Sequence, residues 1–257
     1  LGFDASMFEH KLWLEGSVFY TERYDLITEL ENLYPLLLGT QSTQFWGNYD
    51  ADRINGFELG LKYKTEFSND VALTLGSNFV GTTRKQIQID EPVYTNDYQY
   101  REGTATNSFW GLATDGLYGT EDFDAEGNLL SSLPTPGWGS VAPGDIKYID
   151  KNNDEVINSE DVHVIGKSSA DFQYSLYFNL KVKQFELYAL GVGQTGDMNM
   201  RNGNYFRTYG NLKYPEHLKQ GYSVTNPDVN AIYPRLTSTK SSHNFQNSEY
   251  WMYKNNW

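Results

Sequence analysis

The sequence of 257 residues contains no cysteine. This absence excludes disulfide bonds, thiolate metal sites and cysteine nucleophiles. No segment approaches the run of about eighteen apolar residues that a transmembrane helix requires. The chain opens Leu1-Gly-Phe-Asp, without a basic stretch followed by an apolar one, so no signal peptide is visible.

Positive charge is also scarce, with 20 Lys and Arg against 33 Asp and Glu, which gives a net charge of -13. Because contacts to phosphate need Lys and Arg, we expect no nucleic-acid partner. The four histidines, His10, His163, His217 and His243, do not form the H-E-x-x-H spacing of a zinc enzyme. Walker, G-x-S-x-G and G-x-G-x-x-G motifs are missing too. We therefore predict that the chain is not an enzyme and has no catalytic residues.

Strict alternation of apolar and polar residues is the clearest positive signal. It runs from Phe172 to Val182, with Leu176 and Leu180 on the apolar side and Ser175 on the polar side. Residues 57–67 repeat the pattern, and residues 12–20 show a shorter version. A period of two predicts strands with one apolar face and one wet face. Such strands match the roughly 9–11 residues that cross a membrane better than the roughly 5–6 of an ordinary sheet.

The connections between these strands are predicted to alternate between short and long. Ser68-Asn69-Asp70 and Lys183-Gln184 read as tight hairpin turns. Long polar loops are expected around residues 24–52, 84–104, 119–170 and 200–247. Short turns at one end and long loops at the other are typical of outer-membrane β-barrels. On this pattern alone, a large soluble β-sandwich remains an alternative.

Several segments, in one consistent order, resemble the barrel of the SusC-like (RagA/SusC) TonB-dependent transporters. The block from Pro143 to Tyr174 is the most specific, and the other segments are residues 1–6, 52–59, 108–118 and 248–252. The resemblance implies an all-β fold: a section of an antiparallel transmembrane β-barrel with long extracellular loops. Residues 1–257 would then be a partial barrel domain without the plug, and Trp257 would stand where the family continues into further strands.

The resemblance also implies a function. It is TonB-dependent import of an oligomeric nutrient, a glycan or a peptide, across the cell outer membrane. The expected partners are outer-membrane lipid, a SusD-like surface lipoprotein, the nutrient ligand, and TonB through parts of the protein outside this chain. The alternative is a soluble extracellular β module that binds glycans and is stabilised by calcium. The tyrosines Tyr205, Tyr209, Tyr214 and Tyr222 suit glycan, peptide or lid contacts equally, so substrate-binding residues stay unassigned.

The segment 143–166 is expected to form an acidic extracellular loop with the spacing of an EF-hand calcium loop. Oxygen ligands at positions 1, 3, 5, 7 and 12 of such a loop wrap a hard cation. They would be Asp150, Asn152, Asp154, the Val156 carbonyl and Asp161. The usual glycine of position 6 is replaced by Glu155, and position 12 carries the shorter Asp. A structural Ca²⁺ and an acidic turn held by its own hydrogen bonds both remain open.

Overall fold

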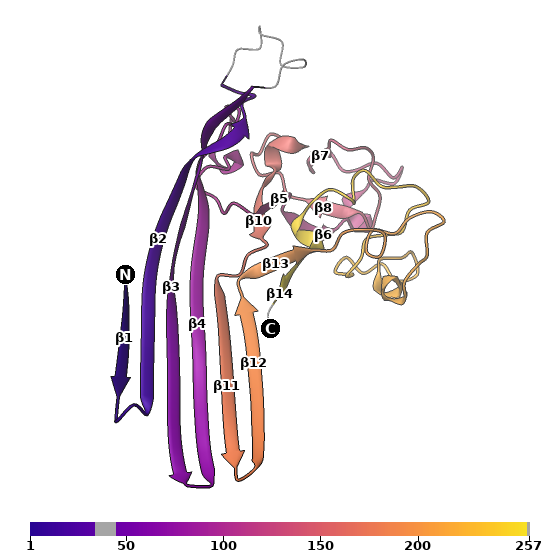
Figure 1. Ribbon diagram of the computed structural model, residues 1–257. Helices are drawn as coiled ribbons and strands as arrows, with labels where there is room; N and C mark the ends of the chain where they lie inside the picture. The colour runs from indigo at the N-terminus through magenta and orange to yellow at the C-terminus, as the bar shows by residue number, and fades with distance from the viewer. Residues whose placement is uncertain (34–44, 256–257) are drawn as a thin grey trace.

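The computed structural model describes residues 1–33 and 45–255 (Figure 1). Part of the expected loop 24–52 and the terminal Trp257 lie outside the described residues. The described chain is all-β, with antiparallel sheets, one short parallel strand pair and a few short 3-10 helices. None of its helices has the length and apolar character to span a membrane.

A six-stranded antiparallel sheet dominates the structure, in the order β1-β2-β3-β4-β11-β12. Its strands are β1 (Gly2–Met7), β2 (Leu12–Glu29), β3 (Trp46–Ser68), β4 (Val71–Gln88), β11 (Phe172–Val182) and β12 (Phe185–Thr195). The predicted strand from Phe172 to Val182 is confirmed at both ends. β11 pairs with β4 and β12 along its whole length. The long segment between β4 and β11 therefore leaves the sheet and returns to it.

The strands β2, β3 and β4 extend further than the sequence pattern predicted. Residues 24–29, 46–52 and 84–88 were expected in loops, but they continue the ladder. Polar side chains stabilise this extension: Arg23 and Arg84 both form ion pairs with Asp52, whose side chain is only 4% exposed. Without an apolar face, this part of each strand has no alternation for a sequence reading to detect.

Three tight turns lie together at one end of the sheet (Figure 1). Asn69 and Asp70 join β3 to β4, and Lys183 and Gln184 join β11 to β12, as predicted. Residues 8–11 join β1 to β2 through three residues with positive φ. The long connections leave from the opposite end of the sheet. The predicted separation of short turns from long loops is therefore confirmed for the described chain.

Two long segments, 89–171 and 196–255, fold against each other beside the loop end of the sheet; we call them the outer module (Figure 1). Its paired strands are β5 (Ser108–Gly111) with β10 (His163–Lys167), β6 (Thr114–Leu117) with β8 (Ile146–Tyr148), β7 (Thr135–Pro136) with β9 (Val156–Ile157), and β13 (Asp197–Met200) with β14 (Met252–Asn255). Its 3-10 helices are η2 (Asp97–Gln99), η3 (Thr120–Asp122), η4 (Ser159–Asp161), η5 (Glu216–Gln220) and η6 (Glu249–Trp251).

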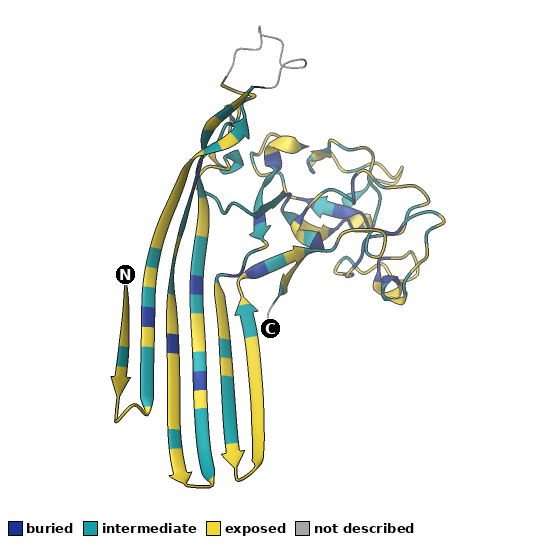
Figure 2. Cartoon of the chain, viewed as in Figure 1, coloured by how far each residue is buried: buried dark blue, intermediate teal, exposed yellow. Residues whose placement is uncertain are grey.

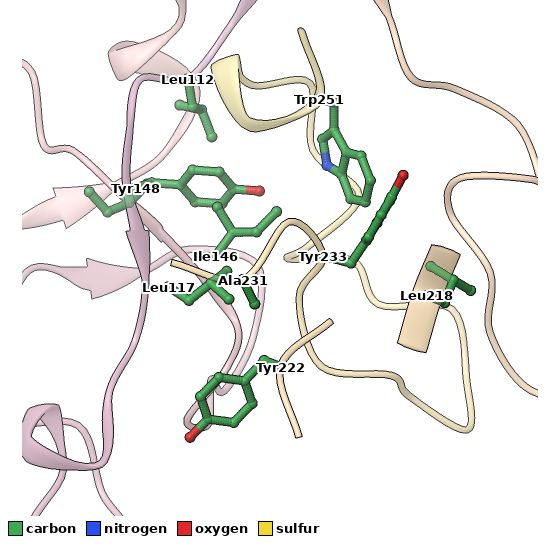
Figure 3. Packing of buried hydrophobic residues seen from close by; sticks show 10 residues of the cluster. Leu112, Leu117, Ile146, Tyr148, Leu218, Tyr222, Ala231, Tyr233 and Trp251 are labelled. Atoms are coloured by element: carbon green, nitrogen blue, oxygen red, sulfur yellow. The ribbon is translucent and has the colours of Figure 1, made fainter. Parts of the chain in front are cut away.

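The main hydrophobic core lies in the outer module, not in the large sheet (Figures 2 and 3). Leu112, Ile146 and Ile157 of the first segment are almost fully buried, and so is Trp251 of the second. The Tyr233 ring packs at a tilt of 51° against the Trp251 indole, with ring centroids 6.4 Å apart. Because the two segments supply the core jointly, they form one packed unit and not two independent loops.

Candidate functional site

One face of the six-stranded sheet is apolar across all six strands. The register aligns one row of apolar side chains from β1 to β12: Met7, Leu12, Tyr63, Leu75, Phe178 and Ala189. Neighbouring rows on this face add Leu14, Val18, Phe57, Leu59, Leu61, Leu73, Phe79, Phe172, Tyr174, Leu176, Leu180, Val182, Phe185 and Leu187. Many of these residues are exposed in the described structure (Figure 2). The most exposed leucine among them is Leu176, at 65%. Patches of a few hundred Å² are already large for a soluble monomer, so this face is built to be covered.

The apolar face has the height of a bilayer core. From Phe57 to Phe67 a strand rises about 33 Å along its axis, which corresponds to about 25 Å of height at the usual tilt of a barrel strand. Phe67 and Phe185 are exposed at the turn end of this band. At the other end the polar pair Glu22 and Arg53 begins, with Nη2–Oε1 at 2.6 Å. An apolar band about 25 Å tall with aromatic residues at its borders is typical of transmembrane barrels.

The opposite face of the sheet is hollowed and mainly polar from β1 to β11. The edge strand β12 adds three exposed apolar side chains to this face: Tyr188, Leu190 and Val192. Ser17 donates to Glu58 at 3.2 Å, and Asn78 donates to Ser175 at 3.1 Å. Three adjoining hollows of about 480, 410 and 440 Å³ lie over this face, and Asn78 contributes to all three. The two faces of the sheet therefore suit two different environments, one apolar and one aqueous.

A buried carboxylate joins the two segments of the outer module. Asp145, of which 2% is exposed, accepts hydrogen bonds from Arg235 Nε at 2.7 Å and Nη2 at 3.0 Å. Asn244 Nδ2 donates to the same carboxylate at 2.7 Å, and Asn244 Oδ1 accepts from the backbone N–H of Ile146. We call this cluster of Asp145, Arg235 and Asn244 the latch. The sequence analysis did not predict it, because partners separated by about a hundred positions leave no local spacing signal.

His243 lies next to this latch and is 3% exposed. Its Nε2 donates to the Ile146 carbonyl at 2.7 Å, and its ring lies 4.7 Å from the Tyr148 ring. Burial lowers the pKa of His243, because the charged imidazolium would lose its water. Burial also raises the pKa of the neighbouring Tyr118 to about 12. Both groups are therefore neutral at physiological pH, as a buried core requires.

The predicted calcium ligands lie in one loop, but their oxygens already accept hydrogen bonds from the backbone. Asp150 accepts from the N–H groups of Asn153 at 2.7 Å and Glu155 at 2.8 Å. Asp154 accepts from the N–H of Val156 at 2.9 Å. The buried Asp161 uses one oxygen for the N–H of Lys151 at 2.7 Å and the other for the N–H of Asn158 at 2.8 Å. Asn152 Nδ2 donates to Asp154 at 2.9 Å.

The carboxylate and carbonyl oxygens of this loop are donor types that calcium prefers, but its carboxylates are not gathered around one point. Glu155 has φ +66°, the left-handed conformation that glycine usually supplies at position 6 of an EF-hand loop. Val156 begins β9 and pairs with β7. Within the described ranges, no group of three or more His, Asp and Glu side chains is placed to hold a metal ion. The calcium site therefore stays a prediction.

The four loop tyrosines do not form one surface. Tyr205 and Tyr214 are exposed, and Tyr209 packs against Phe245 with ring centroids 6.0 Å apart. Tyr222 is 7% exposed and belongs to the core, which corrects its interpretation as a contact residue. Its ring lies against Gly144, where a side chain would clash and where φ is +88°.

No protein-family model and no curated protein matches this sequence. Solved structures do match its fold. The structure of the RagAB peptide transporter aligns with a TM-score of 0.65 at 15% identity, over 98% of this chain and 26% of that chain. The RagAB peptide importer in its closed-closed state aligns with a TM-score of 0.63 at 16% identity, and in its open-open state with 0.65 at 15%.

The chain thus spans about a quarter of the length of the transporters that it matches. At this low identity the likeness shows the fold: an all-β, antiparallel section like the partial barrel of these transporters. It bears out the predicted fold class, and the matched proteins are transporters by their descriptions.

Proposed function

We propose that this chain forms wall and outer loops of a TonB-dependent transporter in the cell outer membrane. The observation that carries the proposal is the apolar face, which stays in register over six strands and faces away from a polar, hollowed side. An apolar outer face suits lipid, and a polar inner face suits an aqueous passage. The imported substrate would be an oligomeric nutrient. A peptide is the first class to test, because the matched structures are described as peptide transporters.

We infer that the outer module faces the outside of the cell and meets a SusD-like lipoprotein, while TonB acts through parts of the protein beyond this chain. The support is the position of the module at the loop end of the sheet, together with its shared core. Preformed surfaces lose less entropy on binding than mobile loops do. This role is non-enzymatic.

The soluble, calcium-stabilised glycan-binding module is the less supported alternative. Such a module would leave the apolar face of six strands in water, including Leu176, Phe185 and Leu187, each more than half exposed. Extended apolar surface of this kind favours aggregation in a soluble protein.

The test is made on the natural polypeptide that contains these residues. Membranes of the source cells are washed with alkaline carbonate and then extracted with detergent, and a peptide from residues 172–182 is followed by mass spectrometry. We expect release only by detergent, from a polypeptide several times longer than this chain, together with a co-purifying lipoprotein. Release by the carbonate wash from a polypeptide of 29.4 kDa would contradict the proposal and favour the soluble module.

We also propose that the loop with Asp150, Asn152, Asp154, the Val156 carbonyl and Asp161 binds a structural Ca²⁺, with a dissociation constant of about 10⁻⁴–10⁻³ M, as in other extracellular sites. Calcium would supply charge neutralisation in a loop that contains Glu155 and Glu160 in addition to these ligands. Glu155→Gly should strengthen binding, because it removes a left-handed non-glycine residue that costs about 1–2 kcal/mol.

Calorimetric titration of the folded, detergent-solubilised protein measures this affinity, with Asp150→Ala as the matched loss-of-ligand variant. Heat of binding that grows in Glu155→Gly and vanishes in Asp150→Ala is the expected result. The absence of binding heat in both the wild type and Glu155→Gly would leave the loop as a self-bonded acidic turn.

A further inference from the structure

An exposed Asn-Gly pair, Asn202 and Gly203, lies just after β13 where the second segment of the outer module begins. The backbone nitrogen of Gly203 lies 2.8 Å from Asn202 Oδ1. The side-chain carbon Cγ, which is bonded to that oxygen, is therefore next to the same nitrogen. Gly203 has φ +78°, and no atom lies within 4 Å of the place where a side chain would stand. No side chain on the following residue therefore stands in the way of the approach of this nitrogen to Cγ.

We propose that Asn202 is a site of spontaneous deamidation, which converts it to aspartate and isoaspartate. The nitrogen of Gly203 attacks Asn202 Cγ, the new N–Cγ bond forms, and the Cγ–Nδ2 bond breaks. The proton of the attacking N–H leaves with the side-chain nitrogen as ammonia, and a five-membered succinimide remains. Solvent water then opens the ring at one of its two carbonyls. The product carries one new carboxylate, and no oxidant or reductant is needed.

A second Asn-Gly pair in the same chain shows why the site is specific. Asn55 and Gly56 lie inside β3, where Gly56 is aligned with Phe19 on β2 and Thr82 on β4. The Gly81 carbonyl lies against Gly56, where even one extra carbon would clash. Closing the ring requires the Asn backbone to leave the extended conformation of a strand, so the ladder must open locally first. Because each 1.4 kcal/mol of opening free energy slows a reaction tenfold, Asn55 should react more than about tenfold slower.

The reaction would loosen the outer module at the turn that follows Asn202. The Gly203 carbonyl accepts hydrogen bonds from the N–H groups of Phe206 at 3.2 Å and Arg207 at 2.9 Å. Arg207 in turn donates to the Phe245 carbonyl at 2.9 Å and lies 5.2 Å from the centre of the Trp251 ring. Isoaspartate adds one carbon to the main chain between residues 202 and 203, which displaces that carbonyl. The turn, and with it the position of Arg207, therefore changes as the protein ages.

The test uses the full polypeptide in detergent, aged in mildly alkaline buffer and analysed by peptide mapping with isoaspartyl methyltransferase labelling. Asn204, in the same exposed turn but followed by Tyr205, is the internal control for exposure, and Asn55 is the control for sequence. We expect Asn202 to convert more than about tenfold faster than either control, with isoaspartate among the products. Equal rates at Asn202 and Asn204, or no conversion of Asn202, would overturn the proposal.

The predicted loosening is tested by hydrogen exchange at the amides of Phe206 and Arg207. Aged wild-type protein should exchange faster there than fresh protein. Asn202→Asp carries the new charge on a normal backbone, so it should exchange like fresh protein. Asn202→Gln should resist ageing, because its longer side chain forms a less favourable ring. Unchanged exchange after ageing would refute the structural consequence while leaving the chemical site intact.

Discussion

Asp145 is a buried carboxylate that connects the two segments of the outer module. It is buried, it accepts hydrogen bonds from Arg235 and Asn244, and these partners come from the other segment of the outer module. A buried carboxylate is stable only when such donors replace its water. Asp145 therefore adds a polar contact between the two segments to the hydrophobic core that they share.

Replacement of Asp145 by Ala should destabilise the outer module by about 1–3 kcal/mol, since Arg235 and Asn244 lose their acceptor. The loss of stability should be smaller than for a fully buried ion pair, because 36% of the Arg235 side chain is exposed. Limited proteolysis of the full polypeptide in detergent, with urea, measures the change. Asp124→Ala is the matched control, since its partner is the nearby Asn128. Equal protease resistance of both variants would show that the latch contributes nothing.

His243 should make the stability of the outer module depend on pH. Its pKa is lowered by burial, so the folded module binds a proton less readily than the unfolded one. Stability is fully present above the unfolded histidine pKa of about 6.5 and is lost as pH falls through the lower, folded pKa. Unfolding followed through the Trp251 environment should show this loss. In His243→Gln, which keeps a donor for the Ile146 carbonyl, this part of the pH dependence should disappear; if it persists, another group is responsible.

The strand β11 contributes side chains to both the apolar and the polar face of the sheet within eleven residues. Leu176 and Leu180 stand on the apolar face, and Ser175 stands on the polar face beside Asn78. The register settles this facing, because paired residues of neighbouring strands point to the same side. In the proposed barrel wall, a shift of one position along the strand would therefore decide whether a charged side chain meets lipid or water.

Leu176→Arg and Leu180→Arg should each impair assembly in the membrane, because a cation on the lipid face near the midplane costs about 2–4 kcal/mol. Ser175→Arg has the same added charge at a neighbouring position and should assemble nearly normally. The amount of heat-modifiable, folded protein in outer-membrane fractions measures the effect. Equal amounts for all three variants would refute the assignment of the two faces.

At the scale of the whole molecule, the large sheet is open. Its outer strands β1 and β12 each have one neighbour among the described residues, so they present unpaired backbone groups at both edges. Such edges are not tolerated in lipid and favour aggregation in water. In the proposed barrel, further strands would pair with these two edges.

The isolated 257-residue chain, expressed alone, should therefore aggregate in buffer and stay dispersed only in detergent. Its apolar face and its two open edges both drive association. Light scattering and gel filtration with and without detergent measure this. A monodisperse, folded monomer in plain buffer would contradict the barrel section and restore the soluble module.

Much of the sheet could be predicted, because a strand with one apolar and one polar face shows an alternation of apolar and polar residues in the sequence. The ends of β11 and the two expected hairpin turns followed from alternation and turn residues alone. The parts of β2, β3 and β4 at the loop end of the sheet could not be predicted in this way. Ion pairs such as Arg23 with Asp52 stabilise them without an apolar face.

The sequence alone determined the all-β class, the apolar and polar sides of the strands, the positions of the tight turns and the acidic loop, because each depends on residues close in sequence. Only the tertiary structure decided which strands are neighbours, that β4 pairs with β11 across a long insertion, and that Tyr222 is buried beside Gly144. It alone joined Asp145 to Arg235. These contacts form between residues distant in the chain, where packing and charge pairing act in space and leave no regular spacing behind.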